Sequence, residues 1–143
     1  FAEFRMTGHQ AIVTGGAQNI GEAISRTFAA AGADVLIADL NGDKAQETAK
    51  KIAAETGANV RGIACNVTKE EDIKRCVADA AKEFGGISTL VNNVGWGRAY
   101  DDPLEVSIDD MVESYKLNTI SAMQMTRHCR PYLLKAKNPS ITN

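Results

Sequence analysis

The chain has 143 residues, a formal net charge of −2, 44% hydrophobic and 24% charged residues, values typical of an ordinary globular protein and not of a disordered one. Its basic residues are dispersed, which argues against nucleic-acid binding, and no apolar run approaches the roughly 20 residues of a membrane span. The three cysteines, Cys65, Cys76 and Cys129, are far apart, which suits a reducing compartment. We therefore expect a cytoplasmic protein with no membrane or nucleic-acid partner.

Strand and helix patterns alternate along the chain with short connections. The apolar runs of strand length are 9–14, 34–38, 59–64 and 87–91, followed by the opening of a fifth strand at 140. The amphipathic segments of helix length are 21–31, 41–55, 68–84 and 107–134. This alternation predicts a three-layer, doubly wound parallel α/β sheet in one domain, 1–143, incomplete near its fifth strand.

Three expectations concern the helices. The first helix should bury Ala23, Ile24, Thr27, Phe28 and Ala31, and the second Ala45, Thr48, Ala49 and Ile52. Thr68 to Glu71 is typical of a capping box at the start of the third. The long fourth helix should turn inward Met111, Tyr115, Asn118, Ala122 and Met125.

A glycine-rich stretch, Thr14 to Gly21, follows the first predicted strand and opens the first helix. Such a turn exposes backbone N–H groups and the positive end of a helix dipole, where a diphosphate can bind. Asparagine, here Asn19, tolerates a left-handed backbone better than other non-glycine residues, so the turn can form around it. The stretch predicts a phosphate-binding turn.

Polar residues end the next three strands: Asp39, Asn66 and the pair Asn92-Asn93. The carboxyl ends of parallel strands meet at one edge of a doubly wound sheet, at the usual crevice for a ligand. Together with the glycine turn, these positions predict a nucleotide site.

Asp39 lies 18 positions after Gly21, near the spacing at which an acidic residue reaches the ribose hydroxyls of NAD. Its carboxylate would repel a 2′-phosphate, and the neutral Gln18 offers no compensating cation, so NAD is favoured over NADP. Capping of the following helix by Asp39 is the alternative, and both roles can coexist.

The combination of Thr14-Gly15-x-x-x-Asn19-Ile20-Gly21, Asp39, Asn66-Val67, Asn93-Val94-Gly95 and Asn118 resembles the short-chain dehydrogenase/reductase family. The resemblance runs over essentially the whole chain and implies a Rossmann fold with an NAD(P) cofactor. It implies cofactor contacts from Gly15, Gln18, Asn19, Ile20, Gly21, Asp39, Leu40, Asn66, Val67, Asn93, Val94 and Gly95. Asn118 matches the family's catalytic helix asparagine, which holds a water in the proton relay. This chain departs from the family pattern by Asn19 for glycine, Asn66 for aspartate and Val94 for alanine.

The resemblance implies an NAD-dependent oxidoreductase that transfers a hydride between a secondary alcohol or ketone and nicotinamide. The family's catalytic serine, tyrosine and lysine are expected beyond residue 143, because Tyr100, Tyr115 and Tyr132 are not followed four residues later by lysine. The family commonly forms dimers or tetramers, so a homo-oligomer is expected.

Trp96, Arg98 and Tyr100 follow the fourth strand and are candidates for a substrate pocket that accepts an apolar alcohol such as a steroid; surface packing is the alternative. The single, distant His9 and His128 do not predict a metal site. Two other functions stay open: a methyltransferase with an adenosyl cofactor, and a non-catalytic NAD sensor.

Overall fold

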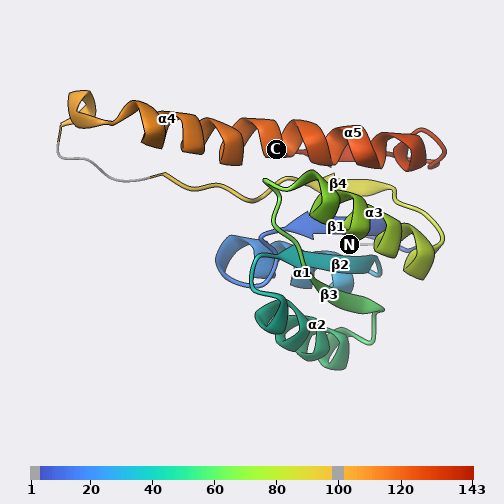
Figure 1. The fold of residues 1–143 in the computed structure, drawn as a ribbon. Coiled ribbons are helices and arrows are strands. Elements are labelled where there is room, and N and C mark those ends of the chain that lie inside the picture. The colour runs from blue at the N-terminus through green and yellow to red at the C-terminus, as the bar shows by residue number, and fades with distance from the viewer. Residues whose placement is uncertain (1–3, 98–101) are drawn as a thin grey trace.

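The computed structural model, which describes residues 4–97 and 102–143, contains a five-stranded parallel sheet (Figure 1). Its strands are β1 (Gln10–Thr14), β2 (Asp34–Asp39), β3 (Val60–Ala64), β4 (Thr89–Val91) and β5 (Ser140–Thr142). They lie in the order β3-β2-β1-β4-β5, and every neighbouring pair is parallel. The predicted strands and the parallel sheet are confirmed.

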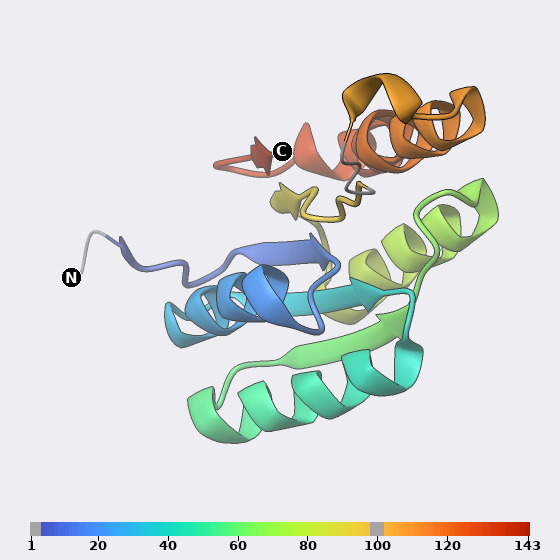
Figure 2. The same cartoon turned by 90° about the vertical axis from the view of Figure 1, so that its left-hand side faces the viewer.

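Helices cover both faces of this sheet. They are α1 (Asn19–Ala30), α2 (Gly42–Thr56), α3 (Glu70–Phe84), α4 (Ile108–Tyr115) and α5 (Ser121–Leu133), with a short 3-10 turn at Pro103–Glu105. One apolar core joins α1 and α2 to the face that carries Val13 and Val35. A second joins α3 and α5 to the face that carries Ile12 and Leu36, which completes the three layers (Figure 2).

The direction of winding reverses at β1. The chain moves outward from β1 to β2 and β3, and then returns to place β4 on the other side of β1. The connections after β1 and β4 therefore diverge onto opposite faces, which opens a crevice at the carboxyl ends of these strands.

The buried face of α1 differs from the prediction. Gly21, Ser25 and Ala29 are buried, whereas Ala23 and Thr27 are exposed. Ile24 and Phe28 are partly buried and pack against the core as predicted. The reason is close packing of small residues against the sheet: Ser25 Oγ donates to the carbonyl oxygen of Gly21 at 2.9 Å and lies 3.4 Å from that of Gly16. For α2 the prediction is confirmed, since its buried residues are Ala45, Thr48, Ala49 and Ile52.

The predicted capping box at Thr68 is wrong. The N-cap of α3 is Lys69, which makes no side-chain capping bond. Thr68 instead donates from its backbone N (3.0 Å) and its Oγ1 (2.7 Å) to Asn66 Oδ1, because a local turn competes for the hydroxyl.

The fourth predicted helix is continuous from α4 to α5 through a π-helical turn, Lys116–Ile120. Met125 is buried as predicted, but Met111, Tyr115 and Asn118 are exposed. Figure 1 shows the cause, since α4 extends well past the edge of the sheet and has no sheet beneath it.

Within the described part of the chain, the structure contains no helix whose length and hydropathy would let it cross a membrane.

Candidate nucleotide-binding site

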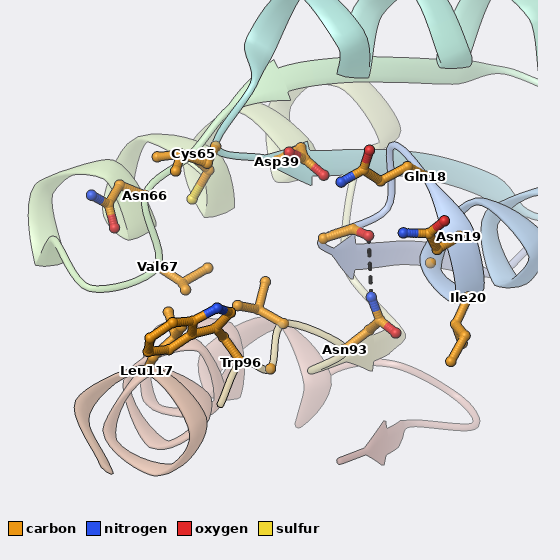
Figure 3. A pocket seen from close by; sticks show the side chains of 15 residues that line it. Gln18, Asn19, Ile20, Asp39, Cys65, Asn66, Val67, Asn93, Trp96 and Leu117 are labelled. Carbon is orange, nitrogen blue, oxygen red and sulfur yellow. Dashed lines mark hydrogen bonds between the residues drawn. The ribbon is translucent and has the colours of Figure 1, made fainter. Parts of the chain in front are cut away.

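A cleft of about 510 Å³ lies at the carboxyl ends of β1 to β4, and we call it the strand-end cleft (Figure 3). It contains every residue for which a cofactor contact was predicted: Gly15, Gln18, Asn19, Ile20, Gly21, Asp39, Leu40, Asn66, Val67, Asn93, Val94 and Gly95. Cys65, Trp96 and Leu117 complete its lining. The structure thus brings twelve predicted positions together from four strand ends.

The glycine turn is shaped by backbone constraints. Gly15 has a φ of 61°, and Asn19, with a φ of 52°, is the one non-glycine residue of positive φ in the described chain, as its expected left-handed role requires. A Cβ at Gly21 would lie 2.0 Å from the carbonyl oxygen of Gly15. Only glycine therefore lets α1 begin this close to β1, with its N-terminus facing the cleft.

Gln18 is the N-cap of α1 but makes no side-chain capping hydrogen bond. The first N–H groups of a helix have no partner within the helix, so this end keeps donors for a ligand. A diphosphate in the strand-end cleft fits these donors and the helix dipole.

Thr14 and Asn93 join the glycine turn to the end of β4. The Thr14 hydroxyl donates to the carbonyl oxygen of Val91 (3.2 Å) and accepts from the backbone N of Asn93 (3.0 Å) and of Val94 (3.2 Å). Asn93 Nδ2 donates to the carbonyl oxygens of Thr14 (3.0 Å) and Gly15 (3.1 Å). The Asn93 amide therefore holds the shape of the turn. The sequence placed Thr14 at the start of the glycine turn but did not predict that its hydroxyl would join the turn to β4.

Asn92 does not face the strand-end cleft, contrary to the expectation that all polar strand ends converge there. Its Nδ2 donates to Asn143 Oδ1 at 2.8 Å, beside β5. Successive side chains at the end of a strand point to opposite sides, so only one of two adjacent asparagines can face the cleft.

Asp39 is held by two backbone donors. Its Oδ2 accepts from the N of Ala17 (3.2 Å) and its Oδ1 from the N of Asn41 (3.0 Å), the N-cap residue of α2. The carboxylate thus supports both the glycine turn and the start of a helix. Each carboxylate oxygen accepts more than one hydrogen bond, so a ribose hydroxyl can still bind there.

Asn66 is held by the first turn of α3. Its backbone N donates to Asp72 Oδ2 at 3.0 Å, and this hydrogen bond is the main reason why the pKa of Asp72 lies below its usual range. Val67 is 5% exposed and belongs to the apolar core while also lining the cleft. Asn66 and Val67 thus bring an amide and an apolar side chain to this wall of the cleft.

Asn118 lies within the π-helical turn, and its amide binds the loop after β4. Its Oδ1 accepts from Trp96 N at 3.0 Å, while its Nδ2 donates to Trp96 O at 2.7 Å and to Ser114 O at 2.8 Å. Both polar atoms of the side chain are therefore engaged with backbone. In this structure Asn118 positions the loop that carries Gly95 and Trp96.

Trp96 separates the strand-end cleft from a second hollow of about 390 Å³, since it lines both. The second hollow is also lined by Gly97, Val106, Asp110, Met111, Ser114, Tyr115, Asn118 and Thr119. The other two predicted substrate residues, Arg98 and Tyr100, lie outside the described residues. Among the residues that are described, no group of three or more His, Cys, Asp or Glu comes together as a metal site would require.

These features define a class of protein: a Rossmann-type α/β fold with its ligand crevice at the reversal of strand order. The family model described as short chain dehydrogenase matches residues 9–143, and the chain belongs to the short-chain dehydrogenase family.

Individual relatives agree with this assignment. The chain is 33% identical to D-threitol dehydrogenase of Mycolicibacterium smegmatis over 99% of its own length and 54% of the relative's. It is 31% identical to 7alpha-hydroxysteroid dehydrogenase of Escherichia coli, over 92% of this chain and 50% of the relative. A solved structure of 7 alpha-hydroxysteroid dehydrogenase with NADH and 7-oxo glycochenodeoxycholic acid superposes with a TM-score of 0.90 at 30% identity, covering 98% of this chain and 54% of that one. The chain thus spans about half the length of the curated relatives it matches.

Proposed function

We propose that residues 1–143 form the cofactor-binding part of an NAD-dependent oxidoreductase that acts on a secondary alcohol or ketone. The observation that carries this proposal is the convergence of the glycine turn, Asp39, Asn66 and Asn93 on one cleft in a member of this family. The dehydrogenase names of the cited relatives, and the NADH in one of their structures, support it.

The residues of the cleft have distinct roles in this proposal. The glycine turn and the α1 N-terminus bind the diphosphate, Asp39 accepts from the adenosine ribose, and Asn66 with Val67 flanks adenine. Nicotinamide supplies the hydride acceptor or donor when bound. Asn118 holds the Gly95–Trp96 backbone, which borders the nicotinamide end of the cleft. The proton-transfer residues of the family have no match within residues 1–143.

NAD is the preferred cofactor in this proposal. Among the described residues that line the strand-end cleft none is Lys or Arg, whereas Asp39 contributes a carboxylate. A 2′-phosphate near Asp39 would meet like charge without a counter-ion.

The second hollow is the proposed binding site for part of the substrate. Trp96, Met111 and Tyr115 give it apolar and aromatic walls, which suit an apolar alcohol such as a steroid. The bile-acid ketone in the structure of the hydroxysteroid dehydrogenase is a ligand of this kind.

A homo-oligomer is proposed as well, because α4 and α5 expose Met111, Val112, Tyr115 and Met123 along one helical rod. Light scattering of the purified chain tests this, and a monodisperse monomer would contradict it.

Titration followed by the fluorescence of Trp96, the only tryptophan, tests the cofactor proposal. We expect NADH to quench it with a Kd at least about tenfold below that of NADPH. A change in Trp96 fluorescence with the methyl donor S-adenosylmethionine, but with neither nucleotide, would support the methyltransferase alternative and contradict the proposal. If the full-length protein binds NADH but turns over no secondary alcohol, the alternative function as a non-catalytic NAD sensor would be favoured.

A further inference from the structure

Asn41 and Gly42 join the end of β2 to the first turn of α2. Asn41 is the one asparagine of the 143 residues that precedes a glycine. Because glycine has no Cβ, the backbone nitrogen that follows the asparagine is not hindered by a side chain. This pair is therefore the place in the chain where a backbone nitrogen most readily reaches the amide carbon of an asparagine side chain.

Packing between α2 and β3 imposes the glycine. A Cβ at Gly42 would lie 2.7 Å from the Cβ of Ala64, the last residue of β3, which is too close for any two such atoms without a shift of backbone. Only glycine therefore lets α2 begin beside the end of β3. The Asn-Gly sequence is a consequence of this close approach.

The side chain of Asn41 is exposed and is oriented by the helix that it caps. Its backbone, with a φ of −88° and a ψ of 92°, is extended and lies outside the helix. Its Oδ1 accepts from the backbone N of Lys44 at 3.0 Å. Its own backbone N donates to Asp39 Oδ1 at 3.0 Å, which ties the pair to the strand-end cleft.

The backbone N–H of Gly42 is free to react. Gly42 is the first residue of α2, so this N–H has no partner within the helix. In the part of the chain that the structure describes, it donates to no other backbone or side-chain acceptor. An attack on Asn41 therefore breaks no hydrogen bond of the Gly42 nitrogen.

We propose that Asn41 is a site of deamidation, at which the backbone nitrogen of Gly42 attacks the side-chain amide and converts Asn41 into aspartate and isoaspartate. The site lies at the edge of the strand-end cleft, two residues after Asp39.

The reaction balances with water as the only co-reactant. The Gly42 nitrogen loses its proton to solvent and bonds to Cγ of Asn41, the Cγ–Nδ2 bond breaks, and Nδ2 takes up a proton and leaves as ammonia. Water then opens the five-membered succinimide ring. It adds to one of the two ring carbonyls, the C–N bond at that carbonyl breaks, and the ring nitrogen is protonated. One amide and one water become one carboxylic acid and one ammonia, with no change of oxidation state.

The start of α2 assists the first step. Negative charge develops on Oδ1 of Asn41 when the Gly42 nitrogen adds to Cγ. The N–H of Lys44 already donates to this oxygen, and the positive end of the helix dipole faces it. Asn66 offers a contrast, because its Oδ1 also accepts a backbone N–H, from Thr68 at 3.0 Å, but valine follows it.

Deamidation should weaken nucleotide binding. The isoaspartyl product carries the backbone through Cβ, which adds one CH2 between β2 and α2 and places a second carboxylate near that of Asp39. Both changes disturb the hydrogen bond from the N of residue 41 to Asp39, next to Leu40, which also lines the cleft. This consequence rests on the proposed function, whereas the deamidation does not.

Peptide mapping of aged protein tests the site directly. Folded wild-type protein is incubated at mildly alkaline pH, digested and analysed by mass spectrometry beside the same chain unfolded in urea. We expect the Asn41 peptide of the folded protein to gain about 1 Da, as OH replaces NH2, and to separate into two isomers. The Asn66 peptide is the internal control and should keep its mass. Asn41→Ser retains a capping oxygen and should not change.

An unchanged Asn41 peptide in folded protein, after a time in which the urea-unfolded chain has been converted, would overturn the proposal. Equal conversion of Asn66 would also overturn it, because Gly42 would then not be the cause.

NADH titration of the deamidated fraction, isolated by ion exchange on its added negative charge, tests the consequence for the cleft. We expect binding about tenfold weaker than in fresh protein, and a smaller loss in Asn41→Asp, which has the charge without the longer backbone. Unchanged affinity in the deamidated fraction would overturn that consequence. Fresh protein that binds no NADH would instead disprove the proposed function, with the peptide map still deciding the deamidation.

Discussion

Asn118 and Trp96 hydrogen-bond each other in both directions: Asn118 Oδ1 accepts from Trp96 N at 3.0 Å, and Asn118 Nδ2 donates to Trp96 O at 2.7 Å. The pair lies 22 residues apart in sequence and fastens the loop after β4 to the π-helical turn.

We therefore expect Asn118→Ala to release the loop. Loss of this pair should cost about 1 kcal/mol of unfolding free energy, since the bonds are partly solvated, and weaken NADH binding about tenfold. Asn118→Asp keeps the acceptor for Trp96 N but places a carboxylate oxygen against the carbonyl oxygens of Trp96 and Ser114, so its effect should be at least as large as that of Asn118→Ala. Denaturant unfolding and Trp96 fluorescence measure both quantities, and wild-type values in both variants would show that Asn118 does not act through this pair.

Gly21→Ala should abolish nucleotide binding. The new Cβ would lie 2.0 Å from the carbonyl oxygen of Gly15, so the glycine turn must move, at a cost of about 1–3 kcal/mol in stability. Gly86→Ala is the matched control, because its Cβ would meet only Gln10 Oε1 at 3.9 Å and its φ is not positive. Thermal unfolding measures the loss of stability in both variants, and NADH titration measures their affinity. Wild-type affinity in Gly21→Ala would refute the proposed turn geometry.

Asp39→Asn should change cofactor preference more than stability. The amide oxygen can still accept from a backbone N–H of Ala17 or Asn41, but the charge that repels a 2′-phosphate is gone. We expect the ratio of the NADPH Kd to the NADH Kd to fall about tenfold. Leu40→Ala serves as the control, since its exposed side chain carries no charge. An unaltered ratio would mean that Asp39 acts only as a backbone support.

Stability should depend on the ionisation of Asp72. Its pKa is lowered in the folded protein, first by the hydrogen bond from the Asn66 N–H and then by Arg75. A carboxyl whose folded pKa is depressed stabilises the fold above its unfolded pKa of about 3.9, and this contribution is lost as pH falls through the folded value. Urea unfolding between pH 7 and pH 3 should show a smaller loss of stability on acidification for Asp72→Asn than for the wild type. Parallel curves for the two proteins would contradict this assignment.

The sequence by itself determined the parallel α/β architecture and the polar strand ends that meet at the strand-end cleft. Both follow from local patterns, because the spacing of apolar residues and the glycines define the strands and helices, and the carboxyl ends of parallel strands must meet. The family resemblance implied the further cleft positions, such as Val67, Val94 and Gly95. Asn19 is a related case, because the family resemblance places it where a glycine usually stands, and its φ of 52° is left-handed as that position implies.

Only the tertiary structure decided which partner each polar side chain takes. The Asn93 amide is directed to the carbonyls of Thr14 and Gly15, while the adjacent Asn92 turns to Asn143. The same holds for Asp72, which accepts from the backbone N of Asn66 because α3 begins beside the end of β3. These choices depend on where remote backbone donors and acceptors come to lie, and no local pattern carries that information.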